Sequence, residues 1–221
     1  MLYLVGAVHS DLKGPKRLRK ILDKIMPSDI ASEADCENTK HYLDANKKIL
    51  EKFETSDDIL EKRIENYSSA KEYIYCRLFE VWVPIEFKFA NPETRIHYLG
   101  EAQSLYSILN YLGYNFDPAS FFDPDVQLNL LLDEFKLINR FDADILYDDD
   151  SISDDPELHK LGCLDVDEAL EPKIRSLIKN VKGDTVFIAG ILHIFGDYHN
   201  LYDRLSDLTP QRIKLKDADN Y

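Results

Sequence analysis

Short apolar runs alternate with longer stretches of helical spacing at the start of the chain. The first run spans residues 2–8 and is rich in strand-forming side chains, and Asp29 to Glu33 is a second short stretch of strand length. Between them, from Arg17 to Met26, apolar side chains recur at helical spacing after Pro15. This order predicts strand, helix and strand, a unit that implies a parallel sheet with right-handed crossovers.

The last third of the chain repeats this plan. Thr185 to Ala189 predicts a buried strand, the residues from about 200 to 208 predict a helix, and Arg212 to Leu215 predict a last strand. A further strand is expected at Arg95 to Leu99. The pattern therefore predicts an α/β fold with a mixed, mainly parallel central sheet, flanking helices and a helical insertion.

The middle of the chain departs from the strand and helix alternation. The helical insertion is expected at about residues 37–92, and the aromatic stretch Leu78 to Phe89 is left open between a buried helix end and a loop. At about 142–160, an acidic stretch is expected to be a mobile, solvated loop, because like charges gather there with few apolar residues to bury. It lacks the ligand spacing of an EF-hand, since the fifth and sixth positions from Asp142 are Leu146 and Tyr147. With these two features the 221 residues fit a single domain, 1–221.

Composition and charge narrow the classes of function. The formal net charge is -14, so the chain lacks the attraction to phosphates on which non-specific nucleic-acid binding depends. The basic residues from Lys13 to Lys20 are expected to form the polar face of the first helix. The three cysteines lie far apart and predict neither a zinc knuckle nor a disulfide framework. The N-terminus has no basic leader, and the apolar runs are well short of the roughly 20 residues that span a bilayer. We therefore expect a cytoplasmic protein without a nucleic-acid or membrane partner, and the sequence leaves its oligomeric state open.

Two Gly-x-x-His motifs carry the candidate chemistry. One runs from Gly6 to His9 after the first strand, and the other runs from Gly190 to His193 after the penultimate strand. A glycine lets the chain bend sharply and approach other groups closely. A single histidine in such a place is more often a structural hydrogen-bonding residue, but two copies in matching contexts are more specific. If the two strands are neighbours in a parallel sheet, both imidazoles lie on the same rim.

Carboxylates on that rim would complete a set of metal ligands. Glu33 ends the second strand and Glu101 follows the third, and paired histidines with a carboxylate commonly bind zinc, manganese, cobalt or iron. The alternatives are an exposed loop acid for Glu33 and, for Glu101, a place in the first turn of a helix, where negative charge is favoured. Asp11 is expected to cap the following helix rather than to orient His9.

The other histidines show no comparable pattern. We expect structural or surface roles for His41, His97, His159 and His199. The sequence has no Gly-x-Ser-x-Gly elbow, no Gly-rich phosphate loop and no recognisable Cys and His signature. Nucleophilic and nucleotide-dependent chemistry therefore have no support in the sequence.

The two ends of the chain resemble the TraB/Tiki family, within the clan that also holds erythromycin-esterase-like and ChaN-like proteins. The likeness lies in Leu4 to Asp11 with the helix that leads to Glu33, and in Val186 to His193 with the closing strand. Where the family often has Glu-Arg-Asp or Glu-Arg-Asn before its penultimate strand, this chain has Asp165-Val166-Asp167. The resemblance implies an α/β core with a helical insertion and a site built from both motif histidines and the glutamate after the second strand.

The resulting hypothesis is a peptidase-like, metal-dependent hydrolase of the TraB/Tiki type. His9, Glu33 and His193 would bind a divalent metal ion that lowers the pKa of a bound water for attack on an amide or ester. Glu33 and Glu101 are the candidate catalytic carboxylates, and the substrate would be a peptide or a small molecule. The alternative is a non-catalytic protein of the same fold that binds or sequesters a peptide or small ligand.

Overall fold

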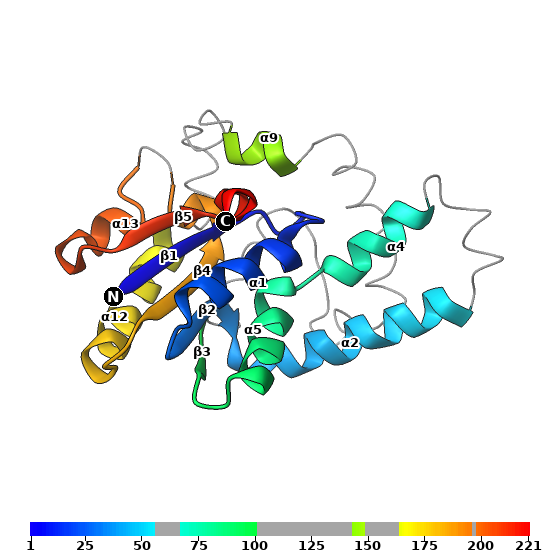
Figure 1. Ribbon diagram of the computed structural model, residues 1–221, viewed down its shortest axis with the longest axis horizontal. Coiled ribbons are helices and arrows are strands. Elements are labelled where there is room, and N and C mark those ends of the chain that lie inside the picture. Colours follow the sequence, from blue (N-terminus) through cyan, green and yellow to red (C-terminus); the bar gives the residue numbers. More distant parts are fainter. Residues whose placement is uncertain (56–66, 101–142, 149–163, 196–197) are drawn as a thin grey trace.

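A single parallel sheet forms the centre of the protein (Figure 1). The computed structural model describes residues 1–55, 67–100, 143–148, 164–195 and 198–221. The five strands are β1 (Leu2–Ala7), β2 (Asp29–Asp35), β3 (Arg95–Gly100), β4 (Thr185–Gly190) and β5 (Gln211–Lys214). Their order in the sheet is β3-β2-β4-β1-β5, and each described pair is parallel. The predicted α/β fold is confirmed, and the sheet is parallel throughout the residues that the structure describes.

The central strand is β4. It pairs with β1 on one side and with β2 on the other, and all of its 6 residues are buried. The register places Gly6 of β1 opposite Ala189, and Ser32 of β2 opposite Ile188. Because parallel strands end at the same edge of a sheet, the segments that follow β1, β2 and β4 meet at one rim.

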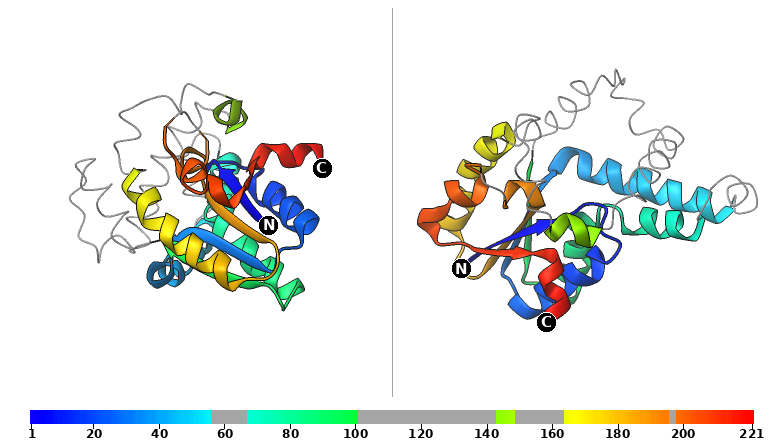
Figure 2. Two further views of the ribbon diagram at one scale, coloured as in Figure 1. Left: turned by 90° about the vertical axis from the view of Figure 1, so that its left-hand side faces the viewer. Right: turned by 90° about the horizontal axis from the view of Figure 1, so that it is seen from above.

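Helices cover both faces of the sheet (Figure 2). On one face, Val186 and Ile188 belong to the core cluster that includes residues of α1 (Gly14–Ile25) and α5 (Phe79–Ala90). Phe187 and Ala189 belong to a second cluster with residues of α12 (Leu164–Asn180) and α13 (Leu201–Arg204). This division follows from the two-residue period of a strand, which directs successive side chains to opposite faces.

Three described helices lie between β2 and β3, where the sequence predicts the helical insertion. They are α2 (Cys36–Thr55), α4 (Tyr67–Cys76) and α5. In Figure 1, α2 and α4 extend away from the sheet, whereas α5 lies against it. The aromatic stretch that the sequence left open is therefore a helix, and it packs on the sheet through Phe79 and Phe87, both fully buried.

Two segments differ from the expectations. Residues 143–148 of the predicted acidic loop form a short helix, α9 (Ala143–Asp148), because Tyr147 is buried and belongs to the same core cluster as α1 and α5. Residues 149–163 lie outside the described part. Arg17 departs from the expected polar face of α1, since it is only 1% exposed and its Nη1 donates to Oδ2 of Asp11 at 2.9 Å.

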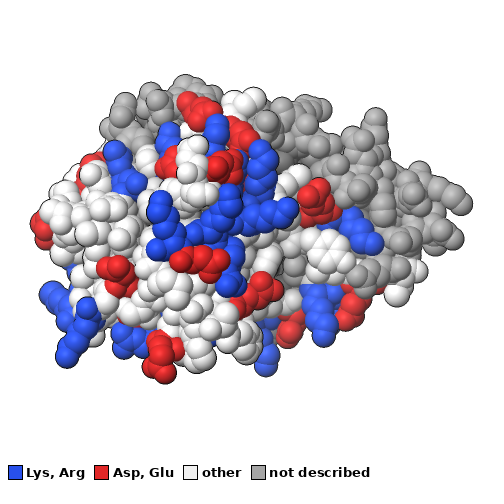
Figure 3. Space-filling view, in the orientation of Figure 1, with Lys and Arg blue, Asp and Glu red and all other residues white. Residues whose placement is uncertain are grey.

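Lysine and arginine side chains gather over the middle of the face shown in Figure 3, although the protein as a whole is acidic. Several of the described lysines and arginines are paired with carboxylates. Lys13 contacts Asp144 at 2.6 Å, and Lys216 contacts Asp148. None of the described helices is long and apolar enough to cross a membrane.

Candidate functional site

His9, Glu33 and His193 lie together at the rim formed by the carboxyl ends of three adjacent strands. His9 follows β1 by two residues, Glu33 lies within β2, and His193 ends the short 3-10 helix η2 (Ile191–His193) directly after β4. Because β4 separates β1 from β2 in the sheet, Glu33 and His9 approach each other across the end of β4. The structure thus brings together the three residues that the sequence predicted as metal ligands.

Both histidines direct Nε2 toward the carboxylate of Glu33. Nε2 of His9 is 3.5 Å from Oε1, and Nε2 of His193 is 3.3 Å from Oε2. Oε1 also accepts a hydrogen bond of 2.9 Å from the backbone N–H of Gly190. Oε2 is buried and makes no hydrogen bond within the described part of the chain. Oε2 is therefore a buried acceptor that lies 3.3 Å from Nε2 of His193 and has no hydrogen-bond donor among the described residues.

The opposite ring nitrogen of each histidine meets a second carboxylate. Nδ1 of His9 is 2.7 Å from Oε1 of Glu80 on α5, and Nδ1 of His193 is 2.7 Å from Oδ1 of Asp167 on α12. Pairing with a carboxylate favours the tautomer that carries its hydrogen on Nδ1. In a neutral imidazole held in this way, the lone pair of Nε2 faces Glu33.

The two histidines differ in their electrostatic surroundings. Burial lowers the pKa of His193, but the charges of Glu33 and Asp167 and the hydrogen bond to Asp167 outweigh it and raise the pKa above its ordinary value. The pKa of Asp167 is raised, chiefly by burial. The side chain of His193 is 13% exposed, whereas that of His9 is 64% exposed. His193 therefore lies at the closed side of the site and His9 at the open side.

Gly190 provides space at the centre of this arrangement. A Cβ at this position would lie 3.2 Å from Nε2 of His9 and 3.6 Å from Oε1 of Glu33. Its φ of -54° is accessible to any residue, so the glycine serves the close approach of His9 rather than the backbone conformation.

An irregularity in β2 aims Glu33 at the site. The pairing of β2 with β3 shifts register between Ser32 and Asp35, and such bulges redirect side chains near sites. A Cβ on Gly100 of β3 would lie 1.8 Å from the carbonyl oxygen of Glu33. The backbone of Glu33 can occupy its position only because residue 100 is a glycine.

Other predicted residues lie elsewhere or outside the described part. Glu101 and His159 lie outside the described residues, as does the side chain of His41. Nε2 of His97 pairs with Asp29 at 2.8 Å, a structural contact at the opposite end of the sheet, and His199 is exposed.

The hydrogen bonds of Asp11 go to the start of α1 and to Tyr147. Its Oδ1 accepts a hydrogen bond from the backbone N–H of Lys13, just before α1, and its Oδ2 accepts from Arg17 and from the hydroxyl of Tyr147. Asp11 therefore lies just before the first helix, but the expectation that it caps this helix is wrong, because the N-cap residue is Lys13.

The partners of the two Nδ1 atoms are the functional candidates that the sequence did not indicate. Glu80 lies in the aromatic stretch whose state the sequence left open. Asp167 lies in the segment Asp165-Val166-Asp167, at the position of the family element before the penultimate strand. That position is the one signal in the sequence that points to Asp167, and we found none for Glu80.

Comparison of the chain with models of protein families, with curated proteins and with solved structures found no match. The resemblance to the TraB/Tiki family therefore remains a prediction that rests on the motif residues.

Proposed function

We propose that the protein is a metal-dependent hydrolase of the TraB/Tiki type and that His9, Glu33 and His193 hold its metal ion. The observation that carries this proposal is the convergence of two imidazole Nε2 atoms on one carboxylate, with the Nδ1 atom of each imidazole paired to a further carboxylate. Metal-binding histidines usually have this second partner, because it fixes the ring and raises the basicity of the ligating nitrogen.

The donor set fits a divalent ion, although the described residues contain no group of three or more such side chains already arranged as metal ligands. Two ligands about 2.1 Å from a tetrahedral metal lie about 3.4 Å apart. The distances from the two Nε2 atoms to the oxygens of Glu33 are 3.5 and 3.3 Å. The buried Oε2 of Glu33 has no hydrogen-bond donor among the described residues, and a bound cation would satisfy it.

Each residue has a distinct task in this proposal. A bound zinc, manganese, cobalt or iron ion would lower the pKa of water enough for attack on an amide or ester at neutral pH. Glu80 and Asp167 hold the imidazoles in place. The N–H of Gly190 holds Oε1 of Glu33, which leaves Oε2 as the oxygen that would contact the metal ion. Glu101, for which the sequence predicts a supporting catalytic role, lies outside the described residues.

Peptide cleavage by the purified, metal-loaded protein tests this function. The protein is stripped with a chelator, reloaded with each of the four metals and incubated with a mixed peptide library, and the products are measured by mass spectrometry. We expect cleavage that the chelator abolishes and that Glu33→Gln lowers by about 100-fold or more. The matched control is Glu86→Gln, which removes the same charge from an exposed position on α5.

The control variant should retain the wild-type rate. A metal-loaded protein that binds a peptide without cleaving it would contradict the hydrolase and support the binding or sequestering alternative.

A further inference from the structure

The loop that carries His9 is attached to a helix from a distant part of the chain. Tyr147 of α9 is 1% exposed, and its hydroxyl accepts a hydrogen bond of 3.0 Å from the backbone N–H of Val8. The same hydroxyl donates to Oδ2 of Asp11 at 3.1 Å. Tyr147 therefore contacts the chain on both sides of His9.

The hydroxyl of Tyr147 accepts the hydrogen bond of the first backbone N–H beyond the end of β1. β1 ends at Ala7, so the N–H of Val8 lies beyond the strand, and Val8 is only 7% exposed. A buried N–H without an acceptor is costly. The hydroxyl of Tyr147 supplies that acceptor at the residue before His9. Burial and the charge of Asp11 raise the pKa of Tyr147, so the hydroxyl keeps the hydrogen that it donates to Asp11.

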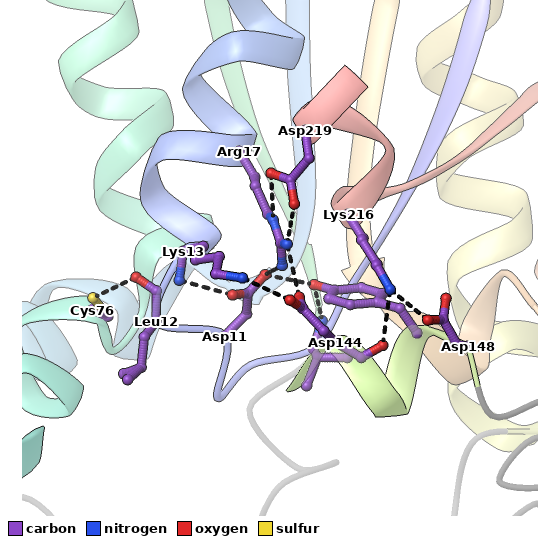
Figure 4. A network of polar contacts seen from close by, with 11 residues as sticks. Asp11, Leu12, Lys13, Arg17, Cys76, Asp144, Asp148, Lys216 and Asp219 are labelled. Atoms are coloured by element: carbon purple, nitrogen blue, oxygen red, sulfur yellow. Dashed lines mark hydrogen bonds and ion pairs between the residues drawn. The ribbon is translucent and has the colours of Figure 1, made fainter. Parts of the chain in front are cut away.

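A network of charges holds α9 in this place (Figure 4). Arg17 contacts Asp11 at 2.9 Å and Asp144 of α9 at 2.7 Å, and it also contacts Asp219 near the C-terminus. From β5, Nζ of Lys214 donates to the backbone carbonyl of Tyr147 at 2.7 Å. Three segments far apart in sequence thus meet around the buried Arg17 and fix α9 against the loop.

The two histidines are positioned from opposite faces of the sheet. Tyr147 belongs to the core cluster that contains residues of α1 and α5. The partner of His193 is Asp167 on α12, the helix that contributes to the cluster on the other face. A change at Tyr147 should therefore act on His9 and leave His193 in place.

We propose that Tyr147 is a positioning residue for His9, which sets the imidazole against Glu33 and Glu80 by holding Val8 and Asp11. Helix α9 then belongs to the site because Tyr147 holds Val8 and Asp11, which lie on either side of His9. The geometric part of this proposal concerns the metal-free protein, and its effect on metal affinity rests on the proposed function.

Tyr147→Phe tests the proposal, since it keeps the buried ring and removes only the hydroxyl. The imidazole signals of His9 and His193 are recorded by NMR in the metal-free protein. We expect the His9 signals to shift, with faster exchange of the hydrogen on Nδ1, and the His193 signals to stay in place. Affinity for zinc, measured by calorimetry, should fall by about tenfold, at the lower end of the effects of groups that orient ligands.

Two further variants keep the test decisive. Tyr202→Phe removes a hydroxyl from a ring that stacks on Arg212 at 4.1 Å, and it should change neither histidine. Lys214→Met loosens α9 at the backbone of Tyr147 without altering the buried ring, and it should shift the His9 signals in the same direction by a smaller amount.

The outcomes separate this proposal from the proposed function. Unchanged His9 signals in both Tyr147→Phe and Lys214→Met would overturn the positioning role, as would equal shifts of His9 and His193. If wild type binds no metal, the hydrolase proposal fails, while the NMR comparison still decides the role of Tyr147.

Discussion

His9 and His193 share a motif but differ in how strongly the protein holds them. His193 is paired with Asp167, whose side chain is 0% exposed, whereas the imidazole of His9 is 64% exposed and is paired with Glu80. Water weakens the electrostatic contribution of an exposed pair, whereas a buried pair is screened much less. Asp167 and Glu80 therefore both orient a histidine, but the pair with Asp167 contributes more binding energy than the pair with Glu80.

Replacing the two carboxylates tests this difference. We expect Asp167→Asn to lower metal affinity by about 100-fold and Glu80→Gln by about tenfold, because partners of ligating histidines contribute between about 10- and 100-fold. Both substitutions preserve shape and remove one charge, so each is the control for the other. The measurement is a calorimetric titration with zinc. Equal losses, or a larger loss for Glu80→Gln, would contradict the assignment of His193 to the closed side.

The sequence indicated the site residues at the ends of strands and missed the site residues that lie on helices. His9, Glu33 and His193 each stand at or just beyond an apolar strand, so their meeting follows once the strands are adjacent in a parallel sheet. Glu80 and Asp167 reach the site from helices whose placement depends on packing, and the charge pattern of a helix does not distinguish a buried carboxylate from a solvated one. Arg17 shows the same limit, because its burial depends on Asp144 and Asp219 from distant segments.

Strand β2 is anchored at its beginning and displaced near its end. At the beginning, Asp29 is fully buried and contacts Arg95 and His97 of β3 at 2.9 and 2.8 Å. Near the end, the register shift opposite Gly100 moves Glu33 toward the site. The anchor fixes the register of the two strands, and the shift gives Glu33 its direction.

The anchor makes a pH-dependent contribution to stability. Burial alone would raise the pKa of Asp29, but the hydrogen bonds from Arg95, His97 and Ser28 outweigh it and lower the pKa. A carboxyl group whose pKa is lower in the folded state stabilises that state fully above its unfolded pKa, about 3.9. This contribution is lost as the pH falls below that value toward the lowered folded pKa.

We therefore expect Asp29→Asn to reduce the free energy of unfolding by about 2 kcal/mol at pH 7, because hydrogen bonds to charged groups contribute about that amount and Arg95 is partly screened by solvent. The difference between wild type and variant should shrink between about pH 4 and pH 3. Urea denaturation of both proteins across pH 3–7 measures this difference in the free energy of unfolding. The contributions of the other carboxyl groups cancel in the difference, because both proteins contain them. A difference that stays constant over this range would contradict the lowered pKa.

The elements themselves were predictable where the pattern was strong. The five described strands lie on the predicted stretches, because each is a segment of strand length followed by a turn or a helix. The pattern is strongest in β1 and β4, which are apolar and buried. The state of α5 was open, since a dense aromatic stretch has no clear period. Helix α9 was missed because its acidic residues suggested a solvated loop, whereas the buried Tyr147 and the ion pair of Asp144 with Arg17 fix it to the core.

For the whole molecule, the order of the strands determines the site. β4 comes near the end of the chain and inserts between β1 and β2 in the sheet, so two motifs from opposite ends of the sequence become neighbours. The sequence predicted that these strands belong to one sheet. It did not predict that β1 and β4 are neighbours, which was only assumed in placing both histidines on one rim. Their adjacency depends on the packing of the helices on both faces, which local patterns do not record.

Metal binding by the two histidines is the central claim, and isothermal titration calorimetry with zinc on the metal-stripped protein measures it directly. We compare wild type with His9→Ala, His193→Ala and the double variant, and use His199→Ala, an exposed histidine, as the matched control. Each single variant should lose about 100-fold or more in affinity, and the double variant little more, because groups that act as one unit are not additive.

Melting of the same metal-free proteins separates binding from folding. His193→Ala should be destabilised by about 1–3 kcal/mol, since it leaves the buried Asp167 without its partner, and His9→Ala should melt close to wild type because its side chain is largely exposed. The account predicts one zinc ion per chain, lost together with either histidine while the control keeps it. Wild-type zinc binding in both single variants, with losses confined to melting, would show that the two histidines are scaffold and that the site is not a metal site.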